Sequence, residues 1–135
     1  MNRKVGLWID HEKAFIISIT NDGEVRRIIT SNMREHYVRY STNMPGDGSA
    51  EDVRDRRYWN HLGEYYTKVI LKIGDAKSIL LFGPGEAKYE LKKLLADKGM
   101  LENIVSVEST DKLTDVQIIK KVREQFPARS EFDLS

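Results

Sequence analysis

Apolar residues recur with two different periods along the chain, and the change of period separates strands from helices. The first part of the chain holds three short β-rich runs, at residues 5–9, 14–20 and 24–30. The polar run Asp10-His11-Glu12-Lys13 separates the first two, and Asn21-Asp22-Gly23, whose residues tolerate positive φ, separates the last two. Two short turns in succession predict an antiparallel meander of three strands.

The remainder of the chain predicts alternating helices and strands. A long helix is expected to begin at the cap Ser49 and to end at Gly74. The residues expected on its buried side recur at a spacing of three or four: Trp59, Leu62, Tyr66, Val69, Ile70 and Ile73. A buried strand at 78–82, a helix at 86–98, a strand at 104–107 and a helix at 114–126 follow. The order β-β-β-α-β-α-β-α predicts an α/β fold with a mixed sheet, an order that ribonuclease H-like domains share.

Length and composition favour one globular domain. The chain has 135 residues, 40% of them apolar and 32% charged, which suits a single core with a solvated surface. We expect the domain to span residues 1–127 and residues 128–135 to form a C-terminal tail. The absence of cysteine excludes disulfides, thiolate zinc sites and cysteine nucleophiles. No apolar run is long enough for a signal peptide or a membrane span, so we expect a cytoplasmic protein without membrane contact.

The segment at residues 31–50 follows neither period, and arginines surround it. A loop of this length inside a compact domain is commonly functional. Because the formal net charge is only +1, nucleic-acid binding requires a local basic patch. The arginines that we expect to form it are Arg34, Arg39, Arg54, Arg56 and Arg57, preceded by Arg26 and Arg27 in the third strand. Tyr37 and Tyr40 alternate with the loop arginines, which is typical of single-stranded RNA contact. Nearby acids offset much of this charge, so an ordinary solvated surface remains the alternative.

No complete catalytic or metal site can be assembled from the sequence. Asp10 ends the first strand, where two-metal hydrolysis would use it, but no second acid follows the strand at 78–82. We therefore interpret Asp10 as a turn residue. The histidines His11, His36 and His61 lack metal-ligand spacing and are expected at the surface or in loops. We expect no metal and no cofactor.

One glycine-rich turn leads into a helix. Gly83 and Gly85 flank a proline there, and free N–H groups at the helix N-terminus can hold an anion. Glu86 follows directly and would repel that anion. A structural tight turn is therefore favoured over an anion site.

Several segments, taken in order, resemble the central domain of the eukaryotic and archaeal peptide release factors and of Pelota. A meander with a basic third strand is followed by His36-Tyr37, and a polar loop precedes a helix of the form Arg-x-x-Arg…Tyr that begins at Arg54. The run Gly83-Pro84-Gly85-Glu86-Ala87-Lys88 is similar to the family's Gly-Pro-Gly-x-x-Lys segment. The resemblance covers residues 5–126 and extends to bacterial single-domain relatives described as translational machinery components.

The loop departs from the release-factor pattern. Release factors carry Gly-Gly-Gln at its tip and promote peptidyl-tRNA hydrolysis, whereas this loop contains Pro45-Gly46-Asp47-Gly48 and no glutamine. Pelota-type proteins also lack the tripeptide and occupy ribosomes without hydrolysis. The flanking domains of the family are not expected here either.

The resemblance implies a non-hydrolytic, translation-associated accessory protein that binds the ribosome or tRNA through the basic loop and helix start. We expect no enzymatic activity and no DNA partner. A protein-interaction or homo-oligomerisation module on the same fold is the first alternative. A metal-dependent hydrolase that uses Asp10 is the second.

Overall fold

The computed structural model describes residues 3–32 and 48–127, with the backbone alone for 48–55. A five-stranded sheet in the order β3-β2-β1-β4-β5 forms its centre. The strands are β1 (Lys4–Ile9), β2 (Lys13–Thr20), β3 (Gly23–Thr30), β4 (Ser78–Gly83) and β5 (Ile104–Ser109). The helices are α2 (Gly48–Ile73), α3 (Ala87–Asp97), the short 3-10 helix η1 (Leu101–Asn103) and α4 (Asp115–Gln125).

The meander and the mixed sheet are confirmed. β1 pairs antiparallel with β2, and β2 with β3, whereas β1 pairs parallel with β4, and β4 with β5. The two short turns force the first pairings to be antiparallel, and the helical connections allow the later strands to run parallel. The α/β class is therefore correct, and the ribonuclease H-like label remains a prediction.

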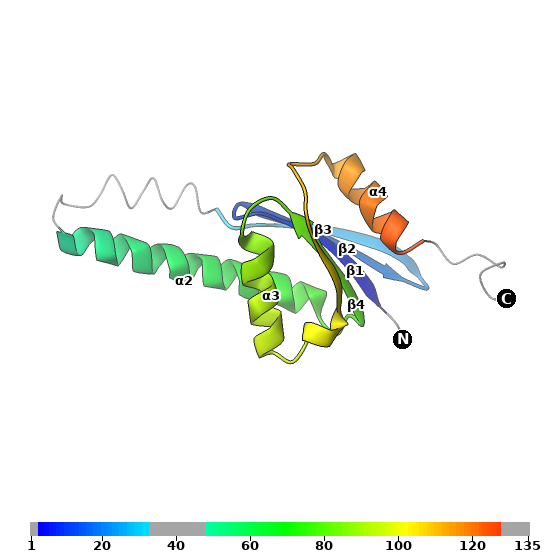
Figure 1. Cartoon of the computed structure of the whole chain (residues 1–135), viewed down its shortest axis with the longest axis horizontal. Helices are drawn as coiled ribbons and strands as arrows, with labels where there is room; N and C mark the ends of the chain where they lie inside the picture. Colours follow the sequence, from blue (N-terminus) through cyan, green and yellow to red (C-terminus); the bar gives the residue numbers. More distant parts are fainter. Residues whose placement is uncertain (1–2, 33–47, 128–135) are drawn as a thin grey trace.

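Helices cover both faces of the sheet (Figure 1). α2 and α3 pack on one face, over a core that includes Leu7, Ile16 and Leu81. α4 packs on the other face, where Ile118 and Val122 contact a core built around Trp8. Because β1 and β4 are covered on both sides, their side chains are apolar on both faces, as expected for central strands.

The long helix differs from its prediction at its start and in its buried stripe. α2 begins at Gly48, so Gly48 and Ser49 are helical. Trp59, expected in the core, is 57% exposed, whereas Tyr65, which was not assigned to the stripe, is buried.

Helix α2 projects well past the sheet (Figure 1). The buried residues Leu62, Tyr65, Tyr66, Val69, Ile70 and Ile73 all lie in the half of the helix nearer its end. Trp59 lies on the same side of the helix as Leu62 and Tyr66, three and seven residues before them. Its helical face is thus that of a core residue, yet Trp59 stays exposed, whereas Tyr58, one residue nearer the start of α2, packs against the core.

Candidate nucleic-acid interface

The projecting end of α2 carries the predicted arginines that the structure describes. Arg56 and Arg57 are both exposed. Arg54 belongs to the same helix, and only its backbone is described. Because α2 begins at Gly48, one residue before the predicted cap Ser49, Arg56 and Arg57 lie in its third turn.

The predicted loop residues cannot be placed. Arg34, Tyr37, Arg39 and residues 45–47 (Pro45, Gly46 and Asp47) lie outside the described residues. Their proposed contact with RNA therefore remains a prediction. Of the loop segment compared with Gly-Gly-Gln, only Gly48 is described, and it is helical.

The arginines of β3 do not join a single basic surface. Arg27 lies opposite Ile16, whose side chain faces α2, whereas Arg26 lies opposite Ile17, whose side chain faces α4. Neighbouring strand residues point to opposite faces of a sheet, so the two guanidinium groups separate. Arg26 also pairs with Glu24 at 3.0 Å.

Glu24 links the sheet to α4 through a second arginine. Arg123 donates from Nε to Glu24 Oε2 at 3.1 Å. The hydrogen bond from Arg123 is the largest cause that lowers the pKa of Glu24, and Arg26 contributes in the same direction. Arg26 therefore acts within an ion-pair network on the α4 face.

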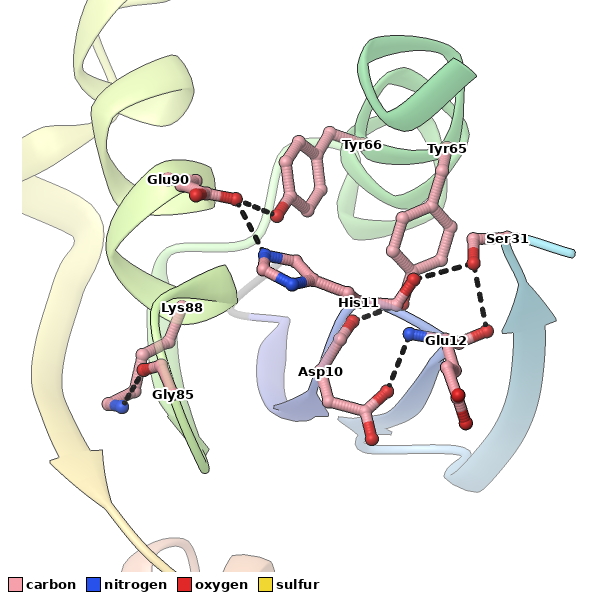
Figure 2. A network of polar contacts seen from close by, with 9 residues as sticks. All are labelled: Asp10, His11, Glu12, Ser31, Tyr65, Tyr66, Gly85, Lys88 and Glu90. Carbon is pink, nitrogen blue, oxygen red and sulfur yellow. Dashed lines mark hydrogen bonds and ion pairs between the residues drawn. The ribbon is translucent and has the colours of Figure 1, made fainter. Parts of the chain in front are cut away.

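The turn after β1 is tied down by its own hydrogen bonds (Figure 2). Asp10 Oδ1 accepts from the backbone N–H groups of Glu12 and Lys13, each at 2.8 Å. Tyr65 donates from its hydroxyl to the Asp10 carbonyl at 3.0 Å, and Ser31 Oγ donates to the His11 carbonyl at 2.6 Å. The interpretation of Asp10 as a turn residue is confirmed.

A carboxylate joins three elements beside this turn (Figure 2). Tyr66 on α2 donates to Glu90 Oε1 on α3 at 2.5 Å. His11 Nε2 lies 2.9 Å from the same oxygen. Burial is the largest cause that raises the pKa of Tyr66, and the hydrogen bond to Glu90 acts in the same direction. The hydroxyl of Tyr66 therefore stays protonated and donates. Sequence reasoning placed His11 in a loop correctly but missed its partner Glu90.

The glycine turn after β4 is closed by a lysine (Figure 2). Lys88 is only 1% exposed, and its Nζ donates to the Gly85 carbonyl at 2.6 Å. The same ammonium lies 4.5 Å from the centre of the Tyr89 ring. Gly83 has φ of 145°, and a Cβ there would lie 2.3 Å from the Ile9 carbonyl oxygen. These contacts favour the structural turn, and the anion site at Gly83 and Gly85 remains untested.

Among the side chains that the structure describes, at residues 3–32 and 56–127, no group of three or more histidines, aspartates or glutamates is arranged to hold a metal ion. No helix in the described part of the chain combines the length and the apolar character needed to cross a membrane.

Comparison with known proteins gives matches in structure but none in sequence. No family model matches the chain, and no curated protein matches its sequence. The Pelota protein of Thermoplasma acidophilum superposes with a TM-score of 0.60 and 15% identity, covering 91% of this chain and 32% of Pelota. The Pelota protein of Archaeoglobus fulgidus superposes with a TM-score of 0.55 and 16% identity, covering 92% of this chain and 31% of Pelota. An archaeal translation termination factor superposes with a TM-score of 0.52 and 13% identity, covering 94% of this chain and 35% of the factor.

The chain therefore spans about a third of the length of the solved structures that it matches. At these identities the likeness establishes the fold. The resemblance predicted from the meander, the long helix and the Gly83–Lys88 turn is confirmed: this chain resembles a domain of Pelota and of an archaeal translation termination factor.

Proposed function

We propose that this protein is a non-hydrolytic accessory protein of translation that binds ribosomal RNA or tRNA through the projecting end of α2 and the preceding loop. The observation that carries the proposal is the exposure of Arg56 and Arg57 on a helix end that extends beyond the sheet (Figure 1). Guanidinium groups contact phosphates with two donors at once, and a projecting helix can approach a polyanion without a clash from the domain.

The fold supports the same proposal. One of the matched structures is a translation termination factor, and the chain covers only about a third of it. The sequence contains no Gly-Gly-Gln, so the proposed activity is binding without hydrolysis. Arg34, Tyr37 and Arg39, which precede α2 in the sequence, belong to the proposed binding surface.

Salt dependence of RNA binding tests the proposal. Affinity for a fluorescent RNA, and co-sedimentation with ribosomes, should fall steeply as salt rises because each phosphate contact releases counterions. Arg54, Arg56 and Arg57 changed together to Ala should weaken binding and reduce the slope of log K against log salt by about 2 for single strands.

The matched control removes three positive charges elsewhere. The control variant changes three lysines in or just after α3 to Ala: Lys92, Lys93 and Lys98. Its net charge is the same as that of the arginine variant. This control should retain most of the affinity. Equal loss in both variants, or RNA binding that ignores salt in the wild type, would contradict the proposal.

A second candidate function is homo-oligomerisation through the sheet edge. Among the described strands β3 lies at one edge of the sheet, and Val25 and Ile28 on it are 50% and 54% exposed. The backbone N–H and C=O groups of an edge strand can pair with a strand of another chain. Light scattering that gives a stable dimer, combined with no ribosome binding, would favour this function over the first.

A further inference from the structure

Trp59 is an exposed indole held in a defined place. Its ring packs edge-on against Tyr58, with 5.3 Å between centroids and 88° between planes. More than half of its surface remains open, at 57%. An aromatic ring that is fixed on one side and open on the other offers a flat apolar surface to a ligand.

A positive charge beside this ring selects the class of ligand. Arg56 is exposed and lies three residues before Trp59, so the two side chains are neighbours on the surface of α2. Arginine beside an exposed aromatic ring is the combination that binds single-stranded nucleic acid, because the ring stacks on a base while the guanidinium contacts phosphate. The bases of a duplex are stacked in its interior, so a duplex can contact the arginines through its phosphates but cannot stack a base on the ring.

We propose that Trp59 stacks on an unpaired RNA base and that this end of α2 recognises single-stranded RNA, such as a loop, in preference to duplex. The inference rests on the proposed RNA-binding function and adds its substrate class. The arginines supply attraction to any RNA, and Trp59 supplies the preference for unpaired bases.

Intrinsic fluorescence provides a direct measurement, because the chain has two tryptophans and the other, Trp8, is only 1% exposed. Oligouridylate should quench the Trp59 emission, whereas a fully paired hairpin stem should leave it nearly unchanged. Acrylamide quenching of the free protein should likewise come from Trp59. In the variant Trp59→Leu, the remaining Trp8 emission should not respond to RNA.

Affinities of matched variants separate stacking from general apolar contact. Stacking contributes about 1–3 kcal/mol per base, so Trp59→Leu should weaken binding of oligouridylate by roughly 5- to 150-fold. Trp59→Phe, which still stacks, should lose much less. Leu71→Ala, at an exposed apolar residue of the same helix, should bind as the wild type does. Because Trp59 and Leu71 are exposed, all three variants should fold, as unchanged Trp8 or far-ultraviolet signals would verify.

The outcomes distinguish this inference from the proposed function. Salt-sensitive RNA binding with equal affinities for Trp59→Leu and Trp59→Phe, or with no preference for unpaired RNA, overturns the stacking and leaves the function. No RNA binding at all overturns both. A protein complex or dimer that Trp59→Leu abolishes, without RNA quenching, would also overturn the inference and assign the ring to a protein partner.

Discussion

The contact between β1 and α4 leaves no room for a side chain at Gly6. A Cβ at this position would lie 2.2 Å from Val122 Cγ2, 2.6 Å from Cγ1 and 2.9 Å from Cβ. Carbon atoms attract each other at about 3.5–4.0 Å, so Gly6→Ala must move Val122 by more than 1 Å. Val122 belongs to the buried side of α4, and moving it separates Ile118 from the core around Trp8.

The expected loss of stability follows from these distances. Overpacking in a core costs about 1–3 kcal/mol, and the three short distances place Gly6→Ala toward the upper end. Val122→Ala removes two methyl groups from a fully buried site and should cost about 2–3 kcal/mol, including the cavity. In the double variant the new methyl at residue 6 occupies part of the vacated space. The two costs should therefore fall short of additivity by about 1–2 kcal/mol.

Urea denaturation followed by Trp8 fluorescence and far-ultraviolet circular dichroism measures all four corners of this cycle. Gly63→Ala is the matched control, because this glycine lies inside α2 and nothing lies within 4 Å of its added Cβ. That change should stabilise the protein, by about 0.5–1 kcal/mol. A neutral Gly6→Ala, or a double variant whose cost is additive within about 0.5 kcal/mol, would refute the packing argument.

Two further predictions concern charged side chains. Lys88→Met should change the free energy of unfolding by less than about 1 kcal/mol, because methionine fills the site without a buried ammonium. Lys88→Ala leaves a cavity beside Gly85 and should lower the free energy of unfolding by about 2–4 kcal/mol. Urea denaturation measures both variants. A large loss in Lys88→Met would show instead that the bond to the Gly85 carbonyl dominates. The pKa of Glu24 is lowered in the folded state from its usual 4.5 by Arg123 and Arg26, so its stabilising effect is present above pH 4.5 and is lost as pH falls through the lower folded value. In the variant Glu24→Gln, the urea midpoint should fall less steeply as the pH drops below 4.5. An unchanged dependence of the midpoint on pH in this range would contradict a stabilising role of the ion pairs of Glu24 with Arg26 and Arg123.

Local patterns predicted the elements well because each element carries its own boundary signal. Asn21-Asp22-Gly23 positions the β2–β3 turn, and Thr114 caps α4 with a reciprocal pair of hydrogen bonds to Gln117. The opposite orientations of Arg26 and Arg27 also follow from the two-residue period of a strand. A basic surface containing both could have been excluded from the sequence alone.

The errors arise where a property depends on contacts distant in sequence. The helical period assigns Trp59 to the buried face, but only the packing of elements distant in sequence decides whether anything covers it. The hydroxyl of Tyr65 can be buried because it donates a hydrogen bond to the carbonyl of Asp10, 55 residues away. The bond between His11 and Glu90 spans 79 residues, and no local pattern encodes it.

The polar groups at the ends of β1 and β4 are bonded within the domain. In open α/β sheets, ligands usually bind beyond the carboxyl ends of the parallel strands. Here the ends of β1 and β4 are occupied by the domain itself, because Asp10 holds its own turn, Glu90 accepts from Tyr66 and lies against His11, and Lys88 closes the glycine turn. These bonds stiffen the edge that an enzyme of this class would use for its substrate.

The projecting half of α2 has the opposite character. It presents exposed guanidinium groups and an exposed indole, and it is joined to the core through the buried turns that follow Leu62. A rigid helix whose far end is anchored in a core positions such groups without ordering them on binding, which reduces the entropy cost of association. The proposed function would use this part of α2 as a supported arm, and the bonded ends of β1 and β4 would add stability to it.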